Sequence, residues 1–346
     1  MFKKLLARHE FLIAAIIVVL SLVIGAINPR FFGVANIFSL VRSATIMGVF
    51  SMGVLIVLIS GGIDVSFPGI AVAAMYTTTE LLVNWNYQGD SMLVPFAMSA
   101  FLGLLMGLVN AFFIARFKLP TFIVTLGTLS LFRGAMLFFV GSKYYNAAEL
   151  PPAMRDYSAA SVLTVQAGRG TTSLHPTIFI LIGIALIVWL VLRYTMLGRG
   201  IYAMGGDREA AERAGFNIAR TQVIIYAVVG VIAGIGGMIV GALFRQANPF
   251  SIVGTELDVI AAVVLGGASI AGGRGTVVGA LLGVLLITIV NNSLILLGIP
   301  SDWQRLVVGF LILIGAGIPL LRARLTERRI AEQRRLEAQA ARSGAL

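Results

Sequence analysis

A series of long apolar runs, repeated along the whole chain, constrains this sequence more than any other feature. Ten runs are recognisable, at approximately residues 11–27, 44–60, 64–83, 92–115, 120–140, 176–192, 221–243, 256–271, 276–297 and 305–321. An α-helix rises about 1.5 Å per residue and the hydrocarbon core of a bilayer is about 30 Å thick, so runs of this length predict membrane-spanning helices. The sequence therefore predicts an all-α polytopic membrane protein with about ten transmembrane helices.

The composition agrees with a membrane protein that has no separate soluble domain. Charged residues make up 12% of the 346 residues, whereas about 25% is usual for a soluble domain. The apolar runs also follow one another closely. We therefore expect one transmembrane domain over residues 1–321 and a charged tail over residues 322–346.

The first 27 residues resemble a secretory signal peptide, because a basic flank precedes an apolar core. The apolar core is long, however, and no clear small-x-small cleavage site follows it. The sequence favours an uncleaved first helix.

The distribution of basic residues predicts the orientation of the chain. If the N-terminus is cytoplasmic, 18 of the 26 lysine and arginine residues fall on cytoplasmic segments, including seven arginines of the tail. The positive-inside rule then places both termini and the loop 193–220 in the cytoplasm, and the loop 141–175 outside. The net charge of +11 is explained by segments that face anionic lipid. Nucleic acid is not an expected partner, because no basic run interleaves with aromatic residues.

Several kinds of chemistry are not expected of this chain. It has no cysteine, and its two histidines, His9 and His175, lie far apart in the sequence, so neither disulfides nor a histidine metal site is expected. None of the four lysines stands in a phosphate-binding G-x-x-x-x-G-K-[ST] loop. We therefore predict neither an ATPase site nor a bound cofactor.

One acidic residue lies where a charge is costly. Asp64 stands in ISGGIDVSFPG, after Gly61 and Gly62 and before Pro68. A carboxylate inside a bilayer costs several kcal/mol unless it is paired or hydrated, and an unwound backbone is tolerated only inside protein or at a cavity. Asp64 and Ser66 either line an internal pathway or belong to the N-terminal cap of the next helix. Both readings stay open.

A second interrupted segment echoes the first. Glu256 and Asp258 begin the eighth run, and Leu257-Asp258-Val259 repeats the pattern of Ile63-Asp64-Val65. Two interrupted segments in the two halves of a chain point to a transport pathway.

Further polar residues interrupt the apolar runs: Glu80, Asn110, Arg133, Asn291 and Asn292. Arg133 and Glu80 are possible partners for the acidic residues. Asparagines within membrane helices are more typical of interhelical hydrogen bonds than of ligand contacts, but Asn291 and Arg133 remain candidates for the pathway.

Glycine pairs at helical spacing predict tightly packed helices. The pairs are Gly103/Gly107, Gly230/Gly234, Gly237/Gly241 and Gly279/Gly283. Small residues let two backbones approach closely, which favours association where lipid removes the hydrophobic driving force between helices.

The stretch MGGDREAAERAG, residues 204–215, is a compact polar island between two apolar runs. Asp207 suits the N-cap of a helix and Gly215 suits its C′ position. Glu209 and Arg213 form an i,i+4 pair of favourable polarity. The sequence predicts a helix of about two turns with a small face of Ala210, Ala211 and Ala214. On this pattern alone, a solvated surface helix without a partner is an equally good interpretation.

Four stretches together resemble a known family. They are ISGGIDVSFPG at 59–69, LPTFIVTLGTLSLFRG at 119–134, GRGIYAMGGDREAAERAG at 198–215 and ELDVIAAVVLGGASIAGGRGTVVGALLG at 256–283. The chain is similar to permease subunits of binding-protein-dependent ABC importers, in the ribose/xylose/autoinducer-2 group of sugar permeases. That group more often reads GGIDLSVG where this chain has Phe67 and Pro68 in VSFPG.

The resemblance implies partners and a mechanism. In such permeases a cytoplasmic EAA-x-x-x-G loop forms the coupling helix that docks into the ATPase, and Glu209, Ala210, Ala211 and Gly215 match it. Gly205, Gly206 and Asp207 are expected to take part in the same coupling segment. The implied partners are two ABC ATPase subunits, a periplasmic sugar-binding protein and a second permease copy or paralogue, in a bacterial inner membrane.

Other functions remain open from the sequence. Asp64, Glu256 and Asp258 would suit the ion site of a secondary transporter. A branched-chain amino-acid permease of the same superfamily and a passive channel are the remaining alternatives.

Overall fold

The computed structural model describes residues 9–167 and 170–300 and six isolated positions between 303 and 313. Most of the predicted tenth helix, residues 305–321, and the charged tail, residues 322–346, lie outside the described residues, as do the basic residues of the N-terminus.

Helices build almost all of the described part of the chain. In order they are α2 (His9–Ile27), η1 (Pro29–Phe32), α3 (Val34–Ile59), α4 (Phe67–Asn84), α5 (Leu93–Ala111), η2 (Phe112–Arg116), α6 (Thr121–Ala135), η3 (Met136–Val140), α7 (Pro152–Tyr157), α8 (Thr177–Tyr194), α9 (Met196–Gly206), α10 (Arg208–Arg213), α11 (Ile218–Phe244), α12 (Glu256–Leu265) and α13 (Val277–Leu296). Seven helical stretches of the described residues are long and apolar enough to cross a membrane: α2, α3, α5 with η2, α6 with η3, α8, α11 and α13. They confirm seven of the predicted spans.

The third predicted span is the helix α4, which lies inside the bundle. Of its 18 residues, 13 are buried. Helices α5, α6 and α11 pack around it. Because these neighbours shield α4 from lipid, threonines and Glu80 are tolerated in it.

The eighth predicted span is not a continuous spanning helix. The prediction of a helix over 256–271 was wrong, because α12 ends at Leu265 after ten residues, about 15 Å and half of the hydrocarbon thickness. Gly266 ends the helix and Gly267 follows with φ +96°, a conformation that favours glycine. This segment confirms the expectation that some of the membrane segments are broken.

Glycine contacts hold the bundle together, as the sequence predicted. A Cβ atom on Gly103 of α5 would lie 2.2 Å from the carbonyl oxygen of Gly230 on α11, and one on Gly234 would lie 2.2 Å from that of Ser99. The hydroxyl of Ser99 also donates a hydrogen bond of 2.7 Å to the carbonyl oxygen of Gly234. These backbones touch because neither helix has a side chain between them.

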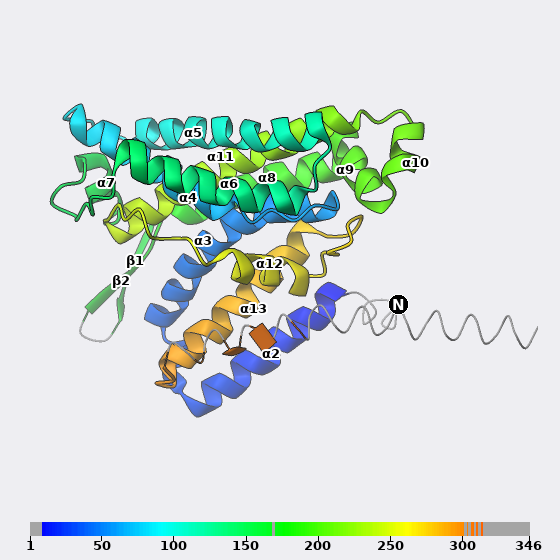
Figure 1. Ribbon diagram of the computed structural model, residues 1–346. Coiled ribbons are helices and arrows are strands. Elements are labelled where there is room, and N and C mark those ends of the chain that lie inside the picture. The colour runs from blue at the N-terminus through cyan, green and yellow to red at the C-terminus, as the bar shows by residue number, and fades with distance from the viewer. Residues whose placement is uncertain are drawn as a thin grey trace, which may run out of the picture.

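The predicted external loop, residues 141–175, has a structure that the all-α prediction did not anticipate. It contains the short helix α7 and an antiparallel hairpin of β1 (Leu163–Ala167) and β2 (Gly170–Leu174). Figure 1 shows α7 at one end of the bundle and α10 at the opposite end. The two loops that the sequence assigned to opposite membrane faces therefore lie at opposite ends.

Candidate functional site

The break between α3 and α4 buries its acidic residue. Helix α3 ends at Ile59, Gly61 takes φ +83°, and α4 begins at Phe67. Asp64 is 1% exposed, and its Oδ1 accepts hydrogen bonds of 2.7 Å from both the backbone N–H and the hydroxyl of Ser66. The N-cap position of α4 is Ser66 rather than Asp64. By binding Ser66, two residues further along the chain, Asp64 therefore stabilises the turn that leads into α4.

Two threonines of α6 satisfy the unwound backbone of this break. The backbone N–H groups of Ile63 and Val65 donate to the hydroxyls of Thr121 and Thr125, each at 3.3 Å. The hydroxyl of Thr125 in turn donates to the carbonyl oxygen of Ile63 at 3.2 Å. The break is thus held inside protein, which is the condition under which an irregular backbone is stable in a membrane domain.

A buried asparagine extends this network. Asn110 of α5 donates a hydrogen bond of 2.8 Å from Nδ2 to the hydroxyl of Ser66. It is an interhelical contact, as the sequence predicted for such asparagines. The remaining oxygens of the network, Asp64 Oδ2 and Asn110 Oδ1, are buried without a hydrogen-bond partner in the part of the chain that the structure describes.

The partners suggested for Asp64 do not reach it. Glu80 accepts hydrogen bonds from the hydroxyl of Tyr145 and from Asn84. The guanidinium of Arg133 lies over the ring of Phe250, 5.7 Å from its centroid. These two residues serve other contacts, so pairing them with the acidic residue of the break was wrong.

The second set of pathway candidates lies on α12 and α13. The carboxylate of Glu256 accepts a hydrogen bond of 2.7 Å from the backbone N–H of Gly254, and Asp258 is half-buried in the first turn of α12. Asn291 of α13 has a buried Oδ1 without a hydrogen-bond partner. The hydrogen bonds of Asp64 and Glu256 are local to their own segments, so they do not join the two acids into one ion site.

The polar island forms the short helix that the sequence predicted. Asp207 caps α10 by accepting a hydrogen bond of 3.0 Å from the backbone N–H of Ala210. Glu209 and Arg213 pair at 3.7 Å. At the other end Gly215 takes φ +88°, and the backbone N–H groups of Gly215 and Phe216 close the helix onto the carbonyl oxygens of Glu212 and Ala211.

The predicted small face of α10 is only partly correct. Ala211 is 3% exposed and packs into the protein, whereas Ala210 and Ala214 are exposed. Ala214 is the C-cap residue, beyond the last helical residue Arg213, and Ala210 remains on the surface with Glu209 and Arg213.

Three glycine-containing backbones meet beside the break. A Cβ atom on Gly205, at the end of α9, would lie 1.8 Å from the carbonyl oxygen of Ile59. The backbone N–H of Gly273 donates to that same oxygen at 2.9 Å. A Cβ atom on Gly272 would lie 2.7 Å from the Cα atom of Gly61. We call this meeting point of residues 59–61, 205–206 and 271–273 the glycine junction.

The glycine junction joins segments that the sequence analysis had assigned to different roles. Gly61 and Gly62 were pathway candidates, and Gly205 and Gly206 were candidates for coupling. The structure brings all four to one cavity of about 240 Å³. Ser60, Thr121, Met204, Arg208, Gln222, Tyr226 and Ala271 complete its lining.

Sequence reasoning missed the polar side chains of this cavity, Thr121, Gln222 and Tyr226. One signal for them was available, because Gln222 and Tyr226 are polar residues at i,i+4 spacing in the apolar run that forms α11. Nothing in the sequence placed Thr121 beside them.

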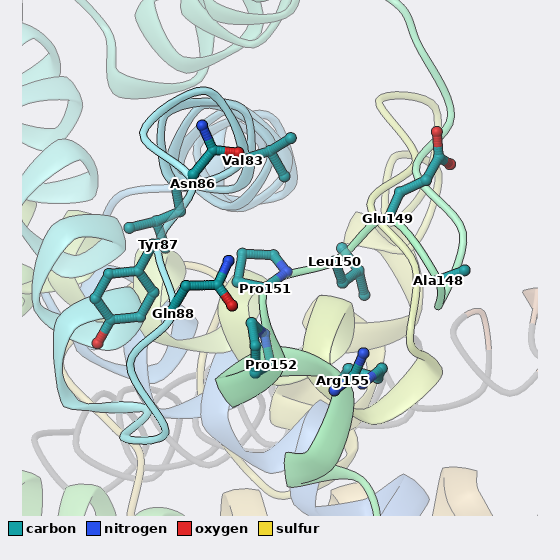
Figure 2. A pocket seen from close by; sticks show the side chains of 11 residues that line it. Val83, Asn86, Tyr87, Gln88, Ala148, Glu149, Leu150, Pro151, Pro152 and Arg155 are labelled. Atoms are coloured by element: carbon teal, nitrogen blue, oxygen red, sulfur yellow. The ribbon is translucent and has the colours of Figure 1, made fainter.

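A second cavity of about 240 Å³ lies between the end of α4 and the segment that carries α7. Figure 2 shows Asn86, Tyr87 and Gln88 on one side of it and Pro151, Pro152 and Arg155 on the other. None of the predicted site residues lines it.

These features define a class of protein. Membrane-crossing helices surround an internal helix, two membrane segments are broken, and a short capped helix at one end is linked by backbone contact to both breaks. Among the described residues no group of histidine, cysteine and acidic residues is arranged to hold a metal ion. The chain is a multi-pass membrane protein built as a transport permease.

Comparison with known proteins gives the family. The chain belongs to the family described as branched-chain amino acid transport system / permease component, which matches residues 36–316. It is 32% identical to the ribose import permease protein of Escherichia coli (strain K12) over 318 residues, covering 90% of this chain and 93% of the relative.

Other relatives have different solutes in their names. The galactose/methyl galactoside import permease protein of Haemophilus influenzae is 32% identical, over 89% of this chain and 94% of the relative. The autoinducer 2 import system permease protein of Shigella flexneri is 30% identical, over 90% and 86%. No solved structure matches the chain. The chain is thus a permease component of an ABC transporter and not its ATPase.

Proposed function

We propose that this chain is the transmembrane permease subunit of an ABC importer for a sugar or a sugar-like small polar solute. The support is the similarity along about 90% of the chain to permeases named for ribose, galactose and autoinducer 2 import. A separate ATPase subunit supplies the energy, and a periplasmic binding protein delivers the solute. Two permease copies, or this chain and a paralogue, form the pathway in a bacterial inner membrane.

The proposed orientation follows the basic residues. Both termini and α10 face the cytoplasm, where Arg199, Arg208, Arg213 and Arg220 surround the coupling segment. The opposite end, with α7 and the hairpin of β1 and β2, faces the periplasm and the binding protein (Figure 1).

The glycine junction is the observation that best supports a coupling role for α10. Gly205 touches the backbone of Ile59, and two residues later Asp207 caps α10. When the ATPase subunits close on ATP, a displacement of α10 is passed through the end of α9 to the α3–α4 break. Backbones in direct contact transmit such a displacement because no flexible side chain lies between them.

The test is uptake by the complete complex in proteoliposomes. Labelled ribose, galactose and leucine are offered with the ATPase and the co-encoded binding protein present. We expect ATP-dependent uptake of a sugar, and no uptake when ATP is omitted. Sugar uptake that persists without ATP would contradict the proposal and favour a passive channel or an ion-coupled transporter.

A branched-chain amino acid is the second candidate solute, because the description of the family names that class. ATP-dependent uptake of leucine without uptake of any sugar would establish this alternative. The coupling role of α10 would then stand, since it does not depend on the solute.

A further inference from the structure

The cavity beside the glycine junction contains polar atoms that the protein itself leaves unpartnered. Gln222 is 5% exposed and Tyr226 is 2% exposed. Among the described residues, Gln222 Oε1 and the hydroxyl of Tyr226 are buried without a hydrogen-bond partner, and both residues line the cavity. A buried polar group without a partner costs about 1–3 kcal/mol. The cavity is therefore built for a polar occupant.

Gly62 brings a third polar group to the same place. A Cβ atom on Gly62 would lie 3.1 Å from Thr121 Oγ1 and 3.2 Å from the hydroxyl of Tyr226. The hydroxyls of α6 and α11 thus approach the same side of Gly62, and the missing side chain leaves room between them.

The chemistry of the lining selects a class of occupant. Arg208 is the only charged residue among those that line the cavity, so a cation is disfavoured there. The hydroxyls of Thr121 and Tyr226 and the amide of Gln222 can each donate and accept hydrogen bonds. Gln222 Oε1 in particular requires a donor. A neutral molecule with several hydroxyl groups meets all of these requirements.

The size of the cavity limits the occupant to a small molecule. A volume of about 240 Å³ has room for about eight water molecules and lies just below the range of about 300–1,000 Å³ that is usual for ligand pockets. A single small solute fits these dimensions better than an oligomer.

The wall of the cavity is also the coupling segment. Gly205 and Gly206 line it, and the next residue, Asp207, is the N-cap of α10. A displacement of α10 therefore changes the shape of the cavity directly.

We propose that this cavity binds the hydroxyl groups of a small neutral polyhydroxylated solute through Thr121, Gln222 and Tyr226. The inference rests on the proposed import function and adds the place where the chain itself holds the solute, next to the coupling segment. Movement of α10 then releases the solute by opening the wall at Gly205 and Gly206.

The experiment compares variants of the complete complex in proteoliposomes, with ribose and galactose as the probes. Gln222→Leu and Tyr226→Phe remove the unpartnered polar atoms. Gly62→Ala keeps every polar group and fills the space between them. Gly183→Ala, where an added Cβ meets nothing within 4 Å, and Tyr194→Phe at the exposed end of α8 are the matched controls.

We expect each cavity variant to raise the half-saturating sugar concentration or lower the maximal rate of uptake at least tenfold. The two controls should behave as the wild type. In parallel, the transported sugar should raise the thermal unfolding temperature of the wild-type permease in detergent, as ligand binding to the folded state requires, and raise that of the Gln222→Leu variant less. This second measurement tests the site even if a variant assembles poorly.

Wild-type uptake by all three cavity variants would overturn the inference and show that the cavity holds water only, while the proposed function would survive. A wild-type complex that takes up leucine and no sugar would overturn both the inference and the proposed solute class. The two failures are therefore distinguishable.

Discussion

At the scale of single residues, the break between α3 and α4 depends on a buried acid with a local partner. Asp64 Oδ1 accepts both hydrogen bonds of Ser66, and Asn110 completes the network from α5. A carboxylate buried in this way needs hydrogen bonds from its surroundings to be tolerated. Its second oxygen, Oδ2, is buried and has no hydrogen-bond partner among the described residues.

We predict that Asp64→Asn impairs transport more than assembly. The asparagine keeps one oxygen for the hydrogen bonds of Ser66, so the amount of folded permease should stay within about twofold of the wild type. Replacing Oδ2 by an NH2 group changes the free side of the network, and uptake should fall about tenfold, equivalent to about 1.4 kcal/mol. Normal uptake by Asp64→Asn would reduce Asp64 to a packing residue.

His175 makes the connection between α7 and α8 sensitive to pH. It is 3% exposed; its Nδ1 accepts the backbone N–H of Thr177 and its Nε2–H donates to the carbonyl oxygen of Tyr157 at 2.7 Å. Burial lowers the pKa of His175, and the charge of Arg42 acts in the same direction. The folded protein therefore prefers the neutral ring, and a second proton on Nδ1 would meet the N–H of Thr177.

The sign of the effect follows from proton linkage. The unfolded chain binds the proton at about pH 6.5, more readily than the folded protein, so stability is complete above that pH and falls as the pH drops below it. We expect hydrogen exchange of the α7 amides to be faster at pH 5 than at pH 8 after correction for the intrinsic rate. His175→Gln should remove most of this difference, and an equal pH effect in the variant would rule the histidine out as its source.

At the scale of elements, close contact between α5 and α11 organises the bundle. Their glycines allow carbonyl oxygens of one helix to lie against the backbone of the other. Helix α11 uses Gly230 and Gly234 toward α5 and Gly237 toward Ala71 of α4. One glycine-rich helix therefore packs against two neighbours.

We predict that Gly103→Ala destabilises the permease, because the added Cβ would lie 2.2 Å from the carbonyl oxygen of Gly230. Overpacking of this kind costs about 1–3 kcal/mol, and the unfolding temperature in detergent should fall. Gly183→Ala is the matched control, since a Cβ there meets nothing within 4 Å. Equal stability of the two variants would show that α5 and α11 move apart at little cost.

The element α10 gives a prediction that separates docking from folding. The exposed pair of Glu209 and Arg213 contributes little to stability, so Glu209→Arg should leave membrane insertion unchanged but abolish co-purification of the ATPase. Asp156→Arg reverses the charge of the acidic residue in a similarly exposed pair at the other end of the bundle. It should have no effect on co-purification of the ATPase.

Gly215→Ala tests the cap of the same helix. Its φ of +88° costs a residue with a Cβ about 1–2 kcal/mol, so the end of α10 should fray and ATPase binding should weaken. Full ATPase binding by both Glu209→Arg and Gly215→Ala would exclude α10 as the docking element.

At the scale of the whole molecule, the chain is a pathway that needs an external source of energy. The end of α9, which leads into α10, and the two broken membrane segments meet at the glycine junction, so under the proposed coupling role a force applied at α10 reaches the membrane interior over a short path. Its family membership as a permease component agrees with this arrangement.

We predict that the purified permease alone, reconstituted into vesicles with ATP and an ion gradient, does not accumulate sugar. Adding the ATPase subunits and the binding protein should establish accumulation. Accumulation against a gradient by the permease alone would contradict the central proposal. The permease with an ATPase variant unable to hydrolyse ATP is the control for leakage.

The sequence determined the local features of this protein. The length of the apolar runs predicted seven spanning stretches that the structure confirms, because a helix is the arrangement that satisfies its own backbone in lipid. Asp207, the Glu209–Arg213 pair and Gly215 predicted α10, because caps and i,i+4 pairs act within a few residues. The first break was visible as the pair Gly61 and Gly62 just before Asp64.

Only the tertiary structure decided which residues and helices contact one another. It gave Glu80 and Arg133 contacts other than Asp64, ended α12 ten residues into its apolar run, and brought Thr121 and Tyr226 to the same side of Gly62. It also joined the end of α9, proposed here as part of the coupling segment, to the α3–α4 break at Gly205. Such contacts depend on how helices far apart in the sequence pack together, and apolar periodicity carries no information about which helices become neighbours.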